Sequence, residues 1–229
     1  MKKYYLILIS IFCFVLPRTA YAQLFFEYGL GYGTYEMTDL KNLLAANNIL
    51  SGVMVTDNFP GYITHDLRIG YSKNQRISFG MLAGYMNTGG KRSLADYSGF
   101  YRVEIRANAF KAAHFVSYQH HCRNPRIRCG IDLSAGGLFT NVLVDEEIKL
   151  IQVSVHEQEK TKLKGANLFV LPAIIGGYQL MPLLFVQGRI GYEWSVIKGG
   201  LRIAQRRTTL TADWSGLRIG VDIRLMFDI

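Results

Sequence analysis

The segment DWSGLRIGVDIRLMFDI, residues 213–229, decides the fold class, because every second residue from Leu217 to Ile229 is apolar. A period of two residues is typical of a β-strand whose two faces meet different surroundings. In a soluble sheet the apolar face is buried and the charged face meets water, whereas a membrane barrel reverses this arrangement. The charged face of this segment carries Arg218, Asp222 and Arg224. The rest of the chain must therefore show which arrangement applies.

The first 22 residues have the three parts of a secretory signal peptide. A basic start and the short apolar run YYLILISIFCFVL are followed by the small residues Ala20 and Ala22, which occupy the positions that a signal peptidase reads. We expect cleavage before Gln23, which removes residues 1–22 and leaves residues 23–229 as one β-barrel domain. This remaining part has no uninterrupted apolar run of the length that a membrane-spanning helix needs.

Alternation of the same kind recurs along the chain in segments of about ten residues, the length of a tilted strand that crosses a bilayer. The sixth of these segments is apolar on both faces, so the pattern does not assign its inner side. The eight segments are residues 24–37, 62–72, 76–86, 100–110, 130–140, 167–179, 184–196 and 217–229.

The connections between these segments alternate in length. Those after the second, fourth and sixth segments are short: KNQR, HHCRNPRIRC and QLMP. Those after the other segments are longer, at residues 37–61, 87–98, 142–164 and 198–212. Membrane barrels show this alternation, with short periplasmic turns and long extracellular loops, and a soluble sandwich has no reason to show it.

The signal peptide, the eight alternating strands, the Gly-rich first strand and the amphipathic last strand together resemble the small eight-stranded outer-membrane β-barrels of the OmpA/OmpX-like, porin-like class. The resemblance implies an all-β, antiparallel transmembrane barrel in the cell outer membrane, surrounded by outer-membrane lipid. It also implies a monomer that is inserted by the barrel-insertion machinery, which reads a C-terminal aromatic residue in this class. Here Phe227 lies two residues before the end and Ile229 is last, so this signal departs from the class pattern.

The polar face of the assignable strands predicts a network of paired charges inside the barrel. An eight-stranded barrel has room only for side chains, and buried charges must be paired. We therefore expect a closed, ion-paired lumen without lysine, and a narrow or gated path for small solutes is the alternative. The predicted members are Glu27, Asp66, Arg68, Arg102, Glu104, Arg106, Asp132, Arg189, Glu193, Arg218, Asp222 and Arg224.

The long connections carry further signals. In residues 38–48, Thr38 or Asp39 can cap a short helix, which we expect to be a surface helix, with a lid over the barrel mouth as the alternative. Residues 142–164 are partly alternating and predict a hairpin that turns near residues 156–160. The basic residues of these connections suit the phosphates of lipopolysaccharide. No module for nucleic-acid binding is visible.

Two cysteines remain after the signal peptide, Cys122 and Cys129, on either side of a turn that contains Pro125. In an exported protein this spacing favours a disulfide. A metal site is a weaker alternative, because two thiolates with only His120 and His121 nearby make an untypical ligand set. We expect no cofactor and no metal.

These signals favour a non-enzymatic barrel that contributes to envelope integrity or binds through its extracellular loops. The alternative from another class is a lipid A-modifying barrel enzyme, an acyltransferase or deacylase, which would need a histidine with a serine or carboxylate at the barrel mouth. His65 has the lipid-facing parity, and His156 lies near a predicted loop tip among carboxylates. No arrangement of nucleophile and base stands out.

Overall fold

The computed structural model describes residues 22–46, 57–73, 76–97, 99–150, 155–204 and 206–228. The predicted signal peptide, apart from Ala22, and the terminal residue Ile229 lie outside these ranges. The elements are β1 (Ala22–Gly33), α2 (Thr38–Ala45), β2 (Asp57–Asn58), β3 (Tyr62–Lys73), β4 (Ile77–Asp96), β5 (Gly99–His121), β6 (Ile127–Leu150), β7 (Val155–Met181), β8 (Leu184–Lys198), β9 (Gly200–Ile203), β10 (Arg206–Thr211) and β11 (Gly216–Asp228).

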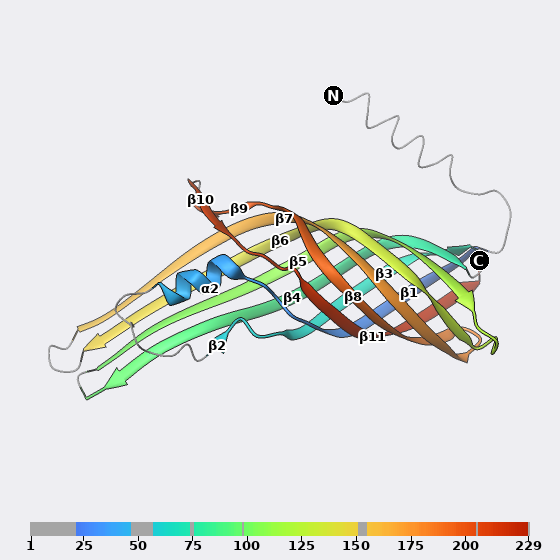
Figure 1. The fold of residues 1–229 in the computed structure, drawn as a ribbon, viewed down its shortest axis with the longest axis horizontal. Coiled ribbons are helices and arrows are strands. Elements are labelled where there is room, and N and C mark those ends of the chain that lie inside the picture. The colour runs from blue at the N-terminus through green and yellow to red at the C-terminus, as the bar shows by residue number, and fades with distance from the viewer. Residues whose placement is uncertain are drawn as a thin grey trace, which may run out of the picture.

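Eight strands form a closed antiparallel ring in the order β1, β3, β4, β5, β6, β7, β8 and β11, and β11 pairs back onto β1 (Figure 1). The eight-stranded barrel predicted from the sequence is confirmed. The connections β3–β4, β5–β6 and β7–β8 are short and lie at the end of the barrel where the chain terminates (Figure 1). This is the periplasmic end predicted from the connection lengths.

At the opposite end, four neighbouring strands continue far beyond the others (Figure 1). β5 has 23 residues whereas β3 has 12, a difference of roughly 35 Å at about 3.3 Å per residue. We call this continuation the extracellular sheet, and it comprises residues 89–96 of β4, 99–109 of β5, 141–150 of β6 and 155–166 of β7.

The extracellular sheet corrects two predicted loops. Residues 87–96 and 142–150 are strand, because they stay in register with β5 and β7. The hairpin expected within residues 142–164 exists, but its predicted turn at residues 156–160 lies inside β7. The chain reverses instead between Leu150 and Val155, which pair with each other, and the residues between them lie outside the described ranges.

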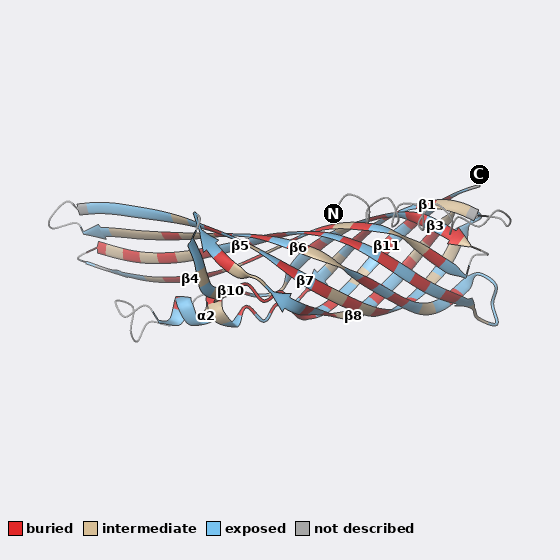
Figure 2. Ribbon diagram, turned by 90° about the horizontal axis from the view of Figure 1, so that it is seen from above, coloured by how far each residue is buried: buried red, intermediate tan, exposed pale blue. Residues whose placement is uncertain are grey.

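Within the barrel, the outward side chains are mostly apolar and the charged side chains point inward, as in a membrane barrel. Burial alternates along each barrel strand (Figure 2). On β11, Leu217 and Val221 are exposed, whereas Arg218 and Asp222 are buried. The sixth segment, unassigned from the sequence, has an inner face that is mostly apolar and consists of Asn167, Phe169, Leu171, Ala173 and Ile175.

The predicted inner face of residues 100–110 is wrong. Arg102, Glu104 and Arg106 point outward on β5, and Val103 and Ile105 are buried on the opposite face. These residues belong to the extracellular sheet, whose outer face meets water instead of lipid. Alternation alone does not reveal whether a face meets lipid or water, so the predicted inner face of this segment is the opposite of the observed one.

Candidate functional site

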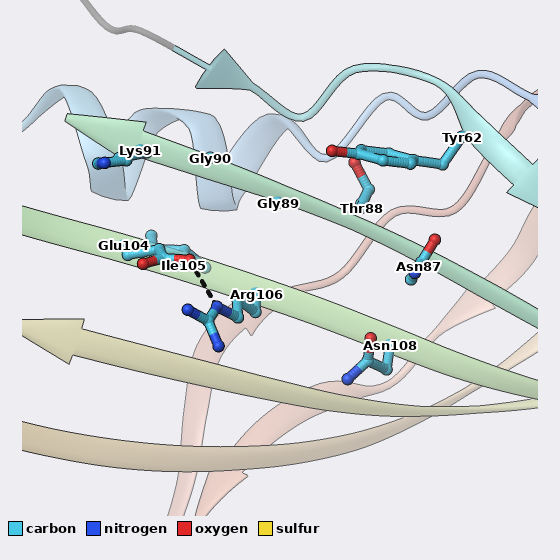
Figure 3. Close-up of a pocket in the computed structure, with 10 residues that line it drawn as sticks. All are labelled: Tyr62, Asn87, Thr88, Gly89, Gly90, Lys91, Glu104, Ile105, Arg106 and Asn108. Carbon is cyan, nitrogen blue, oxygen red and sulfur yellow. Dashed lines mark hydrogen bonds and ion pairs between the residues drawn. The ribbon is translucent and has the colours of Figure 1, made fainter.

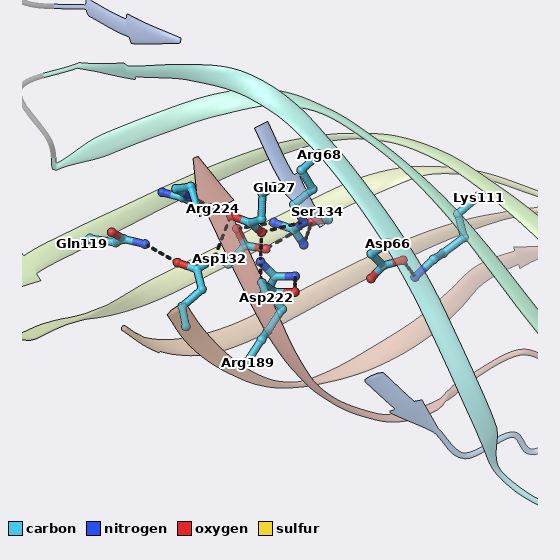
Figure 4. Close-up of polar contacts among 11 residues, drawn as sticks. Glu27, Asp66, Arg68, Lys111, Gln119, Asp132, Ser134, Arg189, Asp222 and Arg224 are labelled. Carbon is cyan, nitrogen blue, oxygen red and sulfur yellow. Dashed lines mark hydrogen bonds and ion pairs between the residues drawn. The ribbon is translucent and has the colours of Figure 1, made fainter. Parts of the chain in front are cut away.

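Glu27 lies at the centre of the lumen with 1% of its surface exposed. Its carboxylate accepts hydrogen bonds from Arg189 Nη2 and from Arg224 Nε, each at 2.7 Å, and Arg68 Nε lies 3.7 Å away. β1 therefore shares one carboxylate with β3, β8 and β11 (Figure 4). Since a buried carboxylate is costly without partners, this contact ties the first strand of the ring to the last.

Two more carboxylates complete this level of the lumen. Asp132 on β6 accepts a hydrogen bond from Arg68 Nη1 at 2.9 Å, and Asp222 on β11 lies 3.0 Å from Arg189 Nη2. Arg68 and Arg189 each bridge two carboxylates, which the branched, planar guanidinium group allows. Figure 4 shows these side chains converging from opposite walls.

A second cluster lies nearer the extracellular mouth. Lys111 Nζ on β5 lies 3.1 Å from Asp66 and 3.6 Å from Glu193, and Arg218 Nη2 donates to Glu193 at 3.0 Å. Lys111 is 1% exposed, so the prediction of a lumen without lysine is wrong. We call these two levels the lumen network: Glu27, Asp66, Arg68, Lys111, Asp132, Arg189, Glu193, Arg218, Asp222 and Arg224.

Nine of the twelve predicted lumen residues belong to this network, and Arg102, Glu104 and Arg106 do not. The alternating pattern does not predict Lys111, because this residue directly follows the fourth segment and is the only lysine or arginine in the run FKAAHF. A signal existed, since Lys111 pairs in register with Gly84 and points to the same face as Asp66. Its detection requires the register of three strands, which the sequence alone does not provide.

Side chains above the lumen network pack together at the barrel mouth. Trp214 is fully buried, donates from Nε1 to Thr140 Oγ1 at 2.9 Å, and packs edge-on against Tyr35. Arg218 Nη1 and Nη2 donate to the carbonyl oxygens of Thr34 and Trp214, both at 2.6 Å. The lumen charges and the mouth are therefore joined through Arg218. A cavity of about 20 Å³ remains beside Asp66 and Arg189, which has room for about one water molecule.

Helix α2 packs on the inner face of the extracellular sheet. Leu40 and Leu44 are fully buried, and Arg92 of β4 donates to the carbonyl oxygens of Leu44 and Ala45 at the helix end. The predicted helix is confirmed, but its predicted side-chain cap is wrong. Met37 precedes the helix in a left-handed conformation, and the Asp39 carboxylate binds Thr211 at the start of the connection to β11 instead.

A pocket of about 250 Å³ opens on the outer face of the sheet, just above the barrel (Figure 3). Arg106 Nε donates to Glu104 at 2.5 Å, and this hydrogen bond, together with the charge of Arg106, holds the pKa of Glu104 below its usual value despite partial burial. The pocket is lined by Tyr62, Asn87, Thr88, Gly89, Gly90, Lys91, Glu104, Ile105, Arg106 and Asn108.

The two cysteines lie at the β5–β6 turn with their sulfur atoms 3.1 Å apart. This separation exceeds the bond length of about 2.05 Å in a disulfide, and both residues are thiols in the structure. The turn thus places the two side chains side by side, and the disulfide stays a prediction.

The histidines considered for catalysis lie on outward faces. His65 Nδ1 is 2.9 Å from the Tyr28 hydroxyl on the lipid-facing side of the barrel, and His156 Nε2 is 3.1 Å from Glu147 on the outer face of the extracellular sheet. Within the described ranges, no group of three or more His, Cys, Asp or Glu residues is arranged to hold a metal ion. The described residues also contain no helix with the length and apolar character of a membrane span.

Comparisons with known proteins bear on the fold alone. No protein-family model matches the sequence, and no curated protein matches it significantly. The outer membrane protein OprG from Pseudomonas aeruginosa is similar in structure, with a TM-score of 0.50 and 9% identity over 91% of this chain and 97% of that chain. Neisserial surface protein A aligns with a TM-score of 0.37 and 11% identity over 90% of this chain and 97% of its own.

The closed eight-stranded ring, its outward apolar residues and its inward charges agree with the similarity to OprG. An apolar exterior of this kind is stable only in contact with lipid. The chain is therefore an eight-stranded antiparallel β-barrel of the bacterial outer membrane.

Proposed function

We propose that the chain is a non-enzymatic outer-membrane barrel with a closed lumen, which anchors the extracellular sheet for binding at the cell surface. The observation that carries this proposal is the continuation of β4–β7 beyond the barrel, with α2 packed on one face of the sheet. A barrel that served only to span the membrane would not need strands of twice the required length.

The packing of the lumen supports the part of the proposal that the barrel has no open channel. Its charged side chains are held by partners on opposite walls, and the mouth is filled by Trp214 and Tyr35. We expect no large, steady conductance from the purified protein in a planar bilayer. A steady conductance would favour the alternative of a pore.

A trimmed variant tests the role of the extracellular sheet. Residues 91–104 and 143–162 are each replaced by an Asn-Gly turn, which joins strand ends that already pair, Gly90 with Ile105 and Val142 with Leu163. Heat-modifiable migration on gels checks that the shortened barrel folds. A strain that lacks the gene is screened under envelope stresses, and the condition with the largest defect is used for complementation.

We expect the full-length chain to restore growth under that condition and the folded, trimmed chain to fail. Full restoration by the trimmed chain would contradict the proposal, because the barrel alone would then be sufficient. Lipid A from the parent and deletion strains should have the same mass spectrum. The enzyme alternative would be favoured if the deletion strain had an altered lipid A spectrum, the full-length chain restored the parent spectrum, and the His65→Ala or His156→Ala variant did not.

A further inference from the structure

The outward side chains of β4, β5 and β6 mark the height at which the apolar band ends. Tyr85, Phe110 and Phe139 lie side by side in register and are exposed to lipid. Two residues nearer the extracellular end of each strand, the same face carries Asn87, Asn108 and Asn141, which are also in register. The change from three aromatic rings to three amides across neighbouring strands places the boundary between hydrocarbon and head groups at this level.

The pocket of Figure 3 lies directly at this boundary. Asn87 and Asn108 form its lower side, and Lys91 and Arg106 follow two or four residues higher on the same outward face. Gly89 leaves space between them, and a Cβ atom there would lie 2.9 Å from the Ile105 carbonyl oxygen. The hollow therefore follows from the strand pairing and from the missing side chain at Gly89.

The two cations of the pocket have donors available. Arg106 uses Nε for its bond to Glu104, and neither of its Nη atoms has a hydrogen bond or ion pair to the described residues. Lys91 pairs in register with Glu104 and its charge helps to lower the pKa of that carboxyl group, but it has no ion pair within 4.0 Å of a described residue. Glu104 thus orients the guanidinium group, whose two terminal nitrogens suit a bidentate contact with a phosphate.

We propose that the pocket formed by Tyr62, Asn87, Lys91, Arg106 and Asn108 binds a phosphate on the sugar head group of an outer-leaflet glycolipid of the lipid A type. The phosphate contacts Lys91 and the free nitrogens of Arg106, the amides of Asn87 and Asn108 bind sugar hydroxyl or acyl carbonyl groups, and the acyl chains run down over Tyr85 and Phe110. Lys91, Arg106 and Asn108 lie at the base of the extracellular sheet. The inference goes beyond the binding role proposed for that sheet, because it names a lipid partner at the membrane boundary and is tested on lipid binding alone.

The test uses the full chain folded in detergent micelles and native mass spectrometry to measure lipid binding. The probes are lipid A with its phosphates, the same lipid A after phosphatase treatment, and inorganic phosphate. The test variant is Lys91→Gln/Arg106→Gln. The matched control is Lys149→Gln/Arg202→Gln, which also removes one lysine and one arginine from exposed extracellular positions.

We expect phosphorylated lipid A to bind at least about tenfold more weakly to the test variant than to the parent or the control, since two charge-assisted contacts are lost. Phosphatase treatment of the lipid should weaken binding to the parent by a similar factor. Equal binding of treated and untreated lipid A, or equal loss in the control, would overturn the proposal. Binding of inorganic phosphate without binding of lipid A would also overturn it.

A single variant covers the case in which the double variant does not fold, as judged by heat-modifiable migration. Lys91→Glu reverses one charge of the pocket and retains both Arg106 and Glu104. It should reduce lipid A binding more than Lys149→Glu does. Equal binding by Lys91→Glu and Lys149→Glu would count against the site.

Discussion

At the scale of single residues, the lumen depends most on Glu27. Glu27→Gln removes the charge that faces Arg68, Arg189 and Arg224. Breaking a buried ion pair by removing one partner costs about 3–5 kcal/mol, and we expect a loss of this size in the free energy of unfolding, measured by urea titration in detergent. Glu104→Gln is the control on the outer face and should cost at most about 1 kcal/mol. Equal losses in the two variants would show that Glu27 does not stabilise the barrel through its arginine partners.

The cysteine pair gives a second prediction at this scale. Protein isolated from the envelope without reductant should resist alkylation at Cys122 and Cys129, and both thiols should react after reduction, as read by mass spectrometry. Because the loop between the cysteines is short, the bridge should contribute only about 2–3 kcal/mol to stability. Complete alkylation without reductant would reject the disulfide.

At the scale of elements, helix α2 should detach without loss of the barrel. Leu40 and Leu44 bury its apolar side against the extracellular sheet, and each truncation to alanine costs about 2–5 kcal/mol. Leu40→Ala/Leu44→Ala should therefore raise hydrogen exchange in residues 38–45 while heat-modifiable migration stays unchanged. Leu43→Ala, at a side chain that is 37% exposed, should leave the exchange as it is.

The elements also show what the sequence pattern can and cannot predict. On β1, β3 and β11 the alternating segment nearly coincides with the part that crosses the membrane, so Glu27, Arg68 and Asp222 were placed on the correct face. On β5 the alternation continues for 23 residues, and the pattern marked its extracellular half as the span. In lipid the polar face of a strand points inward, whereas in water it points outward. Only the register between strands reveals where the part of β5 in lipid ends and the part in water begins.

At the scale of the whole molecule, the position of the apolar band predicts how two matched substitutions on β6 differ. Leu133 and Leu143 point outward on the same strand, Leu133 deep within the band and Leu143 above the row of asparagines. Leu133→Arg should lower the free energy of unfolding in lipid bilayers by about 2–4 kcal/mol, and Leu143→Arg by about 1 kcal/mol or less. Similar losses of unfolding free energy in both variants would contradict this position of the apolar band.

The position of Glu27 also constrains the order in which the barrel is assembled. β1 is the first strand in the chain, yet its carboxylate finds partners on β8 and β11, which are synthesised last. Until β11 docks, Glu27, Arg189 and Arg224 lack these partners, and an incomplete sheet would carry them at the depth of the hydrocarbon. Insertion and ring closure should therefore occur together, so that intermediates of partial length stay at the membrane surface and are open to protease.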